Sequence, residues 1–423
     1  MDKIFGFIKR NRVKILLFIS VFGPATITAM ADNDAAGVAT YAIAGAKLGY
    51  PILFALFWIT ILLGVTQEMG MRLSLVTRKG LADLIRENQG VKTSLVIFIC
   101  LLIANMGGSI IVDVAAFKTT AEILHLPSVA LMLFMLAFSF IFIIKGNYKL
   151  TQRIMLLSSL FYLAYIFSAF KSEPNWGLAF KNLAWPNGVN FTSGYWKDYI
   201  IIGLGVLGTT ITPWGQFFIS SFGLDKKIAT DKLKYSQAET YWGAFVTDFF
   251  SFFMIVATAA TLFIHHIAIT DGTTASLAIK PFAGNLAAVL FALGIMNAGF
   301  MGIITVGLST TYAFSEFFGL TGSLDAPFEK SRIFYTIFII QLVVAFLVVL
   351  FPLIDLFKIA VAAQLLNSFA LPPIFYFLIK YASNHELMGK YVNNGFQKWF
   401  AIVGTVIISL ASIFTVAATI FKF

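Results

Sequence analysis

Two acidic residues separated by one amide, Asp32-Asn33-Asp34, interrupt the first long apolar stretch of the chain. A carboxylate in the middle of a membrane span costs roughly 3 kcal/mol or more unless it faces a cavity, a partner or an ion. Gly23-Pro24 precede these residues and Gly37 follows them, so the helix is weakened on both sides. An interrupted helix with charge at the break is how transporters build ion sites near the bilayer midplane. These residues therefore predict a cation site inside a membrane.

The composition indicates a polytopic membrane protein. Hydrophobic residues make up 59% of the 423 positions and charged residues only 12%, whereas soluble proteins have about 25% charged residues. The first apolar run is too long for a signal peptide and lacks a small-residue cleavage site. The single cysteine, Cys100, excludes an intramolecular disulfide.

Apolar runs between charged and turn-forming residues predict eleven membrane spans. Spans one and six contain helix-breaking residues, and spans six and eight are longer than the ~20 residues that one crossing needs. The predicted spans are 15–46, 51–76, 94–117, 128–144, 152–170, 194–222, 237–266, 283–318, 333–352, 356–379 and 399–421.

The distribution of basic residues predicts the orientation. With the N-terminus in the cytoplasm, 22 of the 30 lysines and arginines fall on the cytoplasmic side and 8 on the other side, as the positive-inside rule requires. An odd number of spans then places the C-terminus outside the cell membrane. This asymmetry accounts for the net charge of +10, so we expect the lipid bilayer as a partner and no nucleic acid.

The spans divide into two halves of five, 15–170 and 194–379, with 399–421 as an added helix of a single transporter domain, 1–423. Span six is interrupted at 208–215, where Pro213 removes a backbone donor and clashes with the preceding turn. Because five is an odd number, the second half must run inverted through the membrane. A kink at Pro213 alone would be ordinary, but interruptions at matching positions of two halves are typical of a transporter site.

Four separated motifs in this order and spacing resemble those of the NRAMP family of divalent metal transporters, and the resemblance covers most of the chain. The first resembles the family's first helix and the second its second helix with the following loop. In the third, Thr212-Pro213-Trp214 replaces the family's Met-Pro-His, and in the fourth a glutamine lies eight residues before a proline. The residues that carry the resemblance are Gly23-Pro24, Asp34-Ala35-Ala36-Gly37, Ala39-Thr40 and Ala44-Gly45-Ala46; Gln67-Glu68-Met69, Arg72-Leu73 and 80–87; Thr212-Pro213-Trp214; and Gln364 with Pro372.

The resemblance implies an all-α polytopic fold of 11 transmembrane helices, with a LeuT-like 5+5 inverted repeat and a metal ion held between broken helices 1 and 6. Asp34 matches the family's metal-binding aspartate and Gly37 its asparagine. Thr209 matches an alanine that lends its carbonyl, Thr212 the methionine and Gln364 the span-ten glutamine. These five residues are the predicted metal-binding set, and the divalent cation is cargo, so we expect no cofactor.

Two departures from the family pattern point to a hard ion. Thr212 offers a hydroxyl where the family has a thioether, and thioethers favour transition metals. Gly37 lacks the family's amide oxygen, which leaves a roomier site lined by oxygen. Mg²⁺ keeps several of its waters and suits such a site. This pattern resembles NRAMP-related magnesium transporters, which also pass Mn²⁺, and we predict transport of Mg²⁺, Mn²⁺ or both.

A third departure bears on proton coupling. Trp214 replaces a family histidine and cannot carry a proton at physiological pH. None of the four histidines lies in the middle of a predicted span, which leaves Asp113 in span three as the candidate titratable group. We therefore predict transport that is not strictly coupled to protons. The alternative is an ordinary proton-coupled importer of Mn²⁺ or Fe²⁺.

Several polar residues have two open interpretations. Asp32 either supports the site from behind or lines a gate, and Asn33 is expected to cap local backbone rather than to bind the ion. Asn367 shares a helical face with Gln364, where the two hold water or ion, or bind neighbouring helices together. Asp248 is a buried polar position without an assigned partner.

Two other functions compete with metal transport. A Na⁺-coupled amino-acid transporter of the same architecture would bind the carboxylate of its substrate, which Asp34 would repel. An enzyme is not supported, because the sequence has no nucleophile elbow, histidine-rich metal cluster or glycine-rich nucleotide loop.

Overall fold

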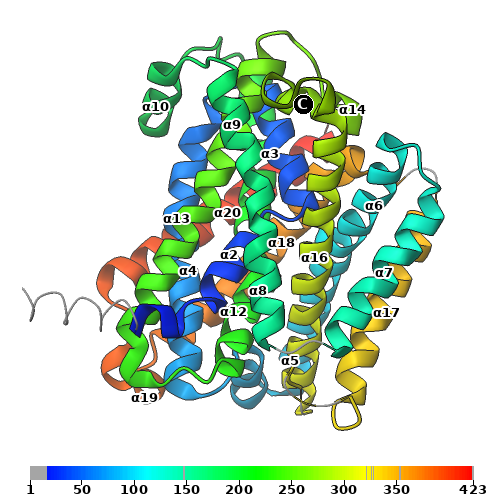
Figure 1. Cartoon of the computed structure of the whole chain (residues 1–423). Coiled ribbons are helices and arrows are strands. Elements are labelled where there is room, and N and C mark those ends of the chain that lie inside the picture. The colour runs from blue at the N-terminus through cyan, green and yellow to red at the C-terminus, as the bar shows by residue number, and fades with distance from the viewer. Residues whose placement is uncertain are drawn as a thin grey trace, which may run out of the picture.

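The computed structural model describes residues 17–145, 148–320, 322–324, 326, 328–351 and 354–421. Helices dominate this part of the chain, which contains no strand, and they stand side by side in one bundle (Figure 1). The helices are α2 (Pro24–Ala31), α3 (Ala35–Leu48), α4 (Ile52–Thr77), α5 (Leu81–Asn105), α6 (Ile111–Ile123), α7 (Ser128–Lys145), α8 (Tyr148–Ser158), α9 (Leu163–Lys171), α10 (Trp176–Ala184), α11 (Ser193–Thr210), α12 (Pro213–Asp225), α13 (Leu233–Thr258), α14 (Gly272–Ser276), α15 (Lys280–Ala283), α16 (Ala287–Phe318), α17 (Arg332–Val349), α18 (Leu356–Ala382), α19 (His385–Met388) and α20 (Gly395–Phe421).

Ten helical stretches of the described chain are long and apolar enough to cross a membrane. Each overlaps one of the predicted spans from the second to the eleventh. The first predicted span is divided into α2, with 8 residues, and α3, with 14, and neither alone reaches the ~20 residues of a crossing. These ten stretches, together with the divided first span formed by α2 and α3, fit the predicted eleven. Residues 15, 16 and 352 of the predicted spans lie outside the described residues.

The third span begins earlier than predicted. Helix α5 starts at Leu81 rather than near residue 94, and a π-helical turn, Met106–Ile110, joins it to α6. Gly90 has a φ of 77° and kinks the helix, a conformation that glycine adopts without steric cost. The charged residues between 81 and 93 favoured a loop at this point in the sequence. They instead belong to a helical segment before the kink, which buries Leu81, Ala82, Leu84 and Ile85.

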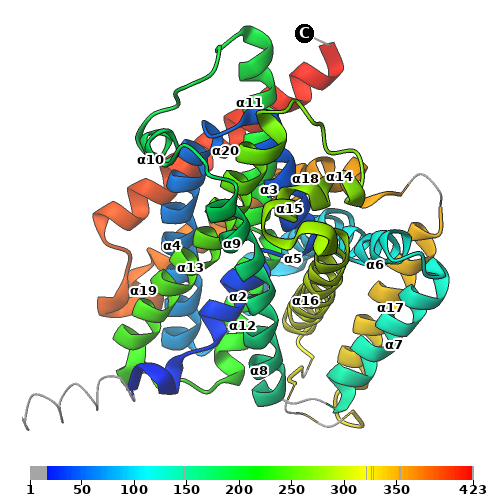
Figure 2. The same cartoon turned by 45° about the horizontal axis from the view of Figure 1, so that its top comes forward.

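The two interrupted helices occupy the centre of the bundle. Every residue of α2 is buried, and α12 is buried from Pro213 to Gly223, whereas α20 buries only five of its 27 residues. The chain rises from α2 to α3 but descends from α11 to α12 (Figures 1 and 2). The two broken spans therefore run in opposite directions, as an inverted repeat requires.

Helix α2 is fixed at its start by a residue far away in the sequence. The carboxylate of Glu239 on α13 accepts hydrogen bonds from the backbone N–H groups of Gly23 (3.0 Å), Ala25 (3.3 Å) and Thr26 (2.7 Å). These groups have no partner within the helix, and a negative charge near a helix N-terminus is favourable. Glu239 therefore caps α2 from the neighbouring helix.

Candidate metal centre

The first break, residues 32–34, ends where Asp34 caps α3. The Asp34 carboxylate accepts a hydrogen bond of 2.7 Å from the Gly37 amide, and the next free amide, that of Ala35, donates to Asp113 Oδ1 at 3.1 Å. Two carboxylates thus converge on one helix N-terminus, where negative charge is stabilised by the helix dipole. Asp113 is fully buried on α6, and its Oδ2 has no hydrogen-bond partner among the described residues.

The second break, residues 211–212, is built in the same way with a neutral cap. Helix α11 ends at Thr210, and the Thr212 hydroxyl accepts a hydrogen bond of 3.1 Å from the Gly215 amide at the start of α12. Pro213 occupies the first helical position, where its missing N–H is not needed. In the second break a hydroxyl and a proline therefore start the new helix, whereas in the first break a carboxylate does so.

The two breaks meet at Asp32. The Thr212 hydroxyl donates to Asp32 Oδ1 at 3.2 Å, and the Thr209 hydroxyl donates to the Asp32 carbonyl at 3.5 Å. Asp32 is 1% exposed, and its Oδ2 has no partner in the described structure. Asp32 is therefore in direct contact with the opposite break. Its two possible roles, as a support of the site or as part of a gate, stay predictions.

Gly37 provides space at this junction. A Cβ atom there would lie 2.9 Å from the Thr209 hydroxyl and would overlap the Asp32 carbonyl, so a larger residue would push the two breaks apart. The Gly37 amide is already bonded to Asp34. Gly37 was predicted as part of the ligand set, and it has no side chain to offer; its contribution here is the close approach of the breaks.

Asn33 differs from its predicted role as a local cap. Its amide nitrogen donates to the Thr247 hydroxyl at 2.7 Å, and its amide oxygen accepts from the Ser251 hydroxyl at 3.0 Å. The Asn33 carbonyl accepts a hydrogen bond from the Tyr162 hydroxyl. Local capping was therefore the wrong interpretation: the Asn33 side chain joins the first break to α13.

Gln364 and Asn367 share one face of α18, as their spacing predicts. The Asn367 amide donates to Gln364 Oε1 at 2.6 Å and to the Ser109 hydroxyl at 3.4 Å. Gln364 Nε2 and Asn367 Oδ1 have no hydrogen-bond partner in the described chain. The Gln364 carbonyl lies directly against Gly208 on α11, so this amide pair is next to the turn that carries Thr209.

Trp214 lies in the first turn of α12, directly after the second break. Its side chain is fully buried and meets the Phe218 ring edge-on, with ring centroids 6.3 Å apart. Its carbonyl accepts a hydrogen bond of 2.7 Å from Ser309, and its indole N–H has no partner within the described residues. The Trp214 ring therefore packs along α12, and its carbonyl joins α12 to α16.

One acidic residue beside the breaks was noted in the sequence without a role. Asp248 on α13 is 4% exposed and lies between Thr247 and Ser251, the two residues that bond Asn33. Neither carboxylate oxygen of Asp248 has a hydrogen-bond partner in the described structure. An ionisable residue inside a span was the signal in the sequence, but only the fold brings it to the first break.

The centre differs in composition from metal sites built from clustered side chains. In the described part of the chain, no three His, Cys, Asp or Glu residues form a group that could hold a metal ion. An ion at the breaks would therefore bind a mixture of carboxylate, hydroxyl, amide and backbone oxygens. Such a set consists of hard ligands, which suit Mg²⁺ and Mn²⁺.

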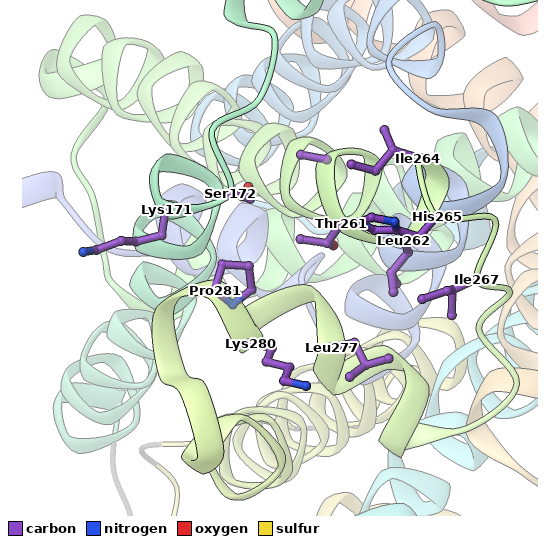
Figure 3. Close-up of a pocket in the computed structure, with 11 residues that line it drawn as sticks. Lys171, Ser172, Thr261, Leu262, Ile264, His265, Ile267, Leu277, Lys280 and Pro281 are labelled. Carbon is purple, nitrogen blue, oxygen red and sulfur yellow. The ribbon is translucent and has the colours of Figure 1, made fainter.

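A pocket of about 570 Å³ lies elsewhere, lined by residues of α9, α15 and the π-helical turn Ala259–Phe263 that follows α13 (Figure 3). Lys171, His265 and Lys280 are among its lining residues, and in the close-up Lys171 points away from the centre of the pocket. Its charged side chains are basic, and none of the carboxylates at the breaks lines it. This pocket therefore has the wrong charge for a cation site.

Comparisons with known proteins agree with this architecture. The family model described as "Natural resistance-associated macrophage protein-like" (Nramp) matches residues 25–418. The chain is 24% identical over 406 residues to the divalent metal cation transporter MntH of Klebsiella pneumoniae (strain 342), covering 93% of this chain and 92% of that protein. It is 24% identical over 425 residues to the natural resistance-associated macrophage protein 2 homolog of Dictyostelium discoideum, covering 98% of this chain and 65% of that one.

Two solved structures share the fold. A manganese transporter of Eremococcus coleocola, crystallised with an aromatic bis-isothiourea substituted compound, aligns with a TM-score of 0.73 at 18% identity, over 95% of this chain and 87% of that one. A Na⁺-coupled sialic acid symporter in a substrate-bound outward-open state aligns with a TM-score of 0.60 at 12% identity, over 94% and 89% of the two chains. The all-α inverted-repeat fold predicted from the sequence is confirmed.

Proposed function

The chain belongs to the Nramp family, and from this premise we propose that it carries divalent metal cations across a cell membrane by alternating access, with Asp34 at the centre of the metal site. The protein is a multi-pass membrane transporter and not an enzyme, and the metal is its substrate. The observation that carries the proposal is the contact of the two breaks, where the Thr212 hydroxyl reaches Asp32, two residues before Asp34, at 3.2 Å. The proposed ligands are Asp34, Thr209, Thr212 and Gln364, with Gly37 allowing the two breaks to approach each other.

We propose Mg²⁺ and Mn²⁺ as the ions. The polar groups that meet at the breaks are carboxylates, hydroxyls and carbonyls, and none is a thioether or thiolate. Mg²⁺ favours oxygen ligands and keeps part of its hydration shell, while Mn²⁺ accepts the same ligands. Manganese also appears in the name of the Eremococcus coleocola transporter.

We further propose that transport is driven by the membrane potential and is not strictly proton-coupled. Trp214 occupies the position of the family's histidine, its buried ring is packed against Phe218, and an indole cannot carry a proton at physiological pH. An inside-negative potential favours entry of a divalent cation by about 4.6 kcal/mol per 100 mV, which is twice the value for one charge. The orientation that we propose places the N-terminus in the cytoplasm and the C-terminus outside.

One observation favours the alternative, a proton-coupled importer of Mn²⁺ or Fe²⁺. Asp113 is a fully buried carboxylate that shares the N-terminus of α3 with Asp34. A buried acid next to the ion site is a natural carrier of a proton. The amino-acid transporter considered from the sequence has no such support, because family membership and the carboxylates of the first break both oppose it.

Uptake into proteoliposomes tests these proposals. Wild type, Asp34→Asn and the matched control Asp271→Asn are compared for Mg²⁺, Mn²⁺ and Ca²⁺ uptake, with a pH dye inside the vesicles. Asparagine caps a helix as well as aspartate does, so Asp34→Asn removes the charge and keeps the cap. Asp271 is exposed and lies in a loop before α14.

We expect Mg²⁺ and Mn²⁺ uptake without acidification in the wild type and in Asp271→Asn, and none in Asp34→Asn. Uptake of Mn²⁺ alone with acidification would establish the proton-coupled alternative. Uptake by Asp34→Asn equal to that of the wild type would overturn Asp34 as the central ligand.

A further inference from the structure

The pocket beside α9 and α15 has three basic residues on its walls and no acidic one. Lys171 ends α9, His265 follows the π-helical turn after α13, and Lys280 begins α15. All three are exposed, and none forms an ion pair within the described residues. Glu173 and Asp271, the acidic residues nearest to them in the sequence, do not line the pocket. Clustered positive charge in a concave site attracts an anion.

The pocket lies where membrane spans end. Lys171 is the last residue of one candidate span, and His265 lies two residues after the end of another, Thr230–Phe263. The aromatic side chains of Phe167 and Phe282 are exposed directly next to the pocket residues. Exposed aromatic rings at the end of a span are typical of the boundary between acyl chains and headgroups. The pocket therefore opens at the depth of the lipid headgroups.

The walls of the pocket are held together by contacts between α9 and the segment that contains α15. The Ser168 hydroxyl donates to the Ala278 carbonyl at 2.6 Å, just before α15. The Phe167 and Phe282 rings stack, with centroids 5.3 Å apart and an interplanar angle of 22°. A site that is already formed loses less conformational entropy when a ligand binds.

The lining of the pocket is both positive and apolar. Lys280 and His265 lie on two segments on either side of the space, while Lys171 points away from its centre (Figure 3). Between them the walls are apolar, with the side chains of Leu262 and Leu277. An ammonium group and an imidazole N–H both donate hydrogen bonds, which the oxygens of a phosphate accept. The matching ligand carries a phosphate joined to hydrocarbon.

We propose that this pocket binds the headgroup phosphate of an anionic phospholipid, with Lys280 and His265 as the donors and the acyl chains along Phe167 and Phe282. A basic pocket between spans is a recognised way to hold an anionic headgroup. The inference goes beyond the proposed function and does not depend on it, because none of the residues at the two breaks lines the pocket. A bound lipid contacts α9, α15 and the end of span seven together.

Saturable quenching of a fluorophore at the rim of the pocket tests this inference. In the purified full-length protein with Cys100→Ser, bimane is attached at Lys171→Cys. A second sample carries it at Lys181→Cys on α10, an exposed position that does not line the pocket. Phosphatidylglycerol or phosphatidylcholine with a nitroxide near the carbonyl end of its acyl chain is then titrated in detergent.

At Lys171→Cys we expect phosphatidylglycerol to quench at a concentration about fivefold lower than phosphatidylcholine, since a basic residue near a lipid phosphate contributes roughly 1 kcal/mol. Adding Lys280→Gln should remove most of this preference. Lys280→Arg keeps the charge and should retain the preference, which separates loss of a contact from loss of folding. The matched control Lys181→Gln should also retain it.

Three results would overturn the lipid site. The first is equal quenching by the two lipids at Lys171→Cys, and the second is the same preference at Lys181→Cys, which would mean unspecific attraction. The third is loss of the preference with inorganic phosphate but not with chloride at the same ionic strength, which would identify a site for free phosphate. All readouts are of lipid binding, so the proposed metal transport is tested separately.

Discussion

The two interrupted spans share a design but differ in charge. In each, a side-chain oxygen caps the second half-helix: Asp34 caps α3 at 2.7 Å and Thr212 caps α12 at 3.1 Å. The first break carries two carboxylates, and the second carries only a hydroxyl and backbone. A charged cap attracts a cation, and a neutral cap shapes its coordination. For the metal site that we propose, this difference assigns affinity for the ion to the first span and selection among ions to the second.

Moving the charge between the breaks should have the largest effect. The double variant Asp34→Thr with Thr212→Asp keeps a capping residue at both breaks and preserves the total charge. It places a new carboxylate against Asp32, which Thr212 now contacts at 3.2 Å, and like charges at that distance repel. We expect Mn²⁺ uptake into proteoliposomes to fall by about 100-fold or more, equivalent to roughly 2.7 kcal/mol. Uptake within tenfold of the wild type would show that the position of the charge is unimportant.

Weakening the support of the first span should have the next largest effect, on stability. Glu239→Gln replaces a carboxylate that accepts three backbone N–H groups by an amide that presents a donor to one of them. Leaving such a buried group unsatisfied costs about 1–3 kcal/mol. We expect a lower melting temperature in detergent, measured by intrinsic fluorescence, while the exposed control Glu329→Gln melts like the wild type. An unchanged melting temperature for Glu239→Gln would show that the Glu239 cap does not stabilise α2.

Changing the neutral cap should alter selectivity by a smaller factor. Thr212→Met introduces a thioether, which favours transition metals over Mg²⁺. We expect the ratio of Mn²⁺ to Mg²⁺ uptake to rise by about tenfold, or roughly 1.4 kcal/mol. Thr212→Ser keeps the hydroxyl and should leave the ratio unchanged. If Thr212→Met and Thr212→Ser give the same ratio, the second break does not select the ion.

The smallest effect is expected at Trp214. Its indole N–H has no hydrogen-bond partner among the described residues, and its ring packs on Phe218. Trp214→Phe keeps an aromatic ring and removes only the unpaired donor, so uptake should change by less than about threefold, or roughly 0.7 kcal/mol. A tenfold change in uptake, with the melting temperature preserved, would mean that the indole N–H acts on the ion path.

Local patterns allowed much of this molecule to be predicted. Residues four apart on a helix share a face, a rule that accounts for the ion pair of Arg72 with Glu68, whose Nε and Oε1 atoms are 2.7 Å apart. The same rule placed Gln364 and Asn367 together. Both breaks were predictable because each contains helix-weakening residues within an apolar run. The effects of a buried charge and of proline on a helix are local, so they can be recognised from a few neighbouring residues.

The unpredicted features depend on contacts between residues far apart in the sequence. Asn33 and Thr247 are separated by 214 positions, and Glu239 lies 216 positions after Gly23. Neither pairing leaves a periodic signal, so Asn33 was interpreted as a local cap and Asp248 was left without a partner. The early start of α5 was not predicted for another reason. The segment from Leu81 to the kink at Gly90 is rich in charged residues, and such a composition is also typical of a loop.

The cap that Glu239 provides has a mechanical consequence. Helix α2 is held to α13 at its start by that carboxylate and near its end by the amide of Asn33. Because α2 is attached to α13 at two points, it cannot tilt independently without breaking one of these sets of hydrogen bonds. We therefore expect α2 and α13 to move together as one rigid unit. Their displacements should have the same amplitude when the protein changes conformation during transport.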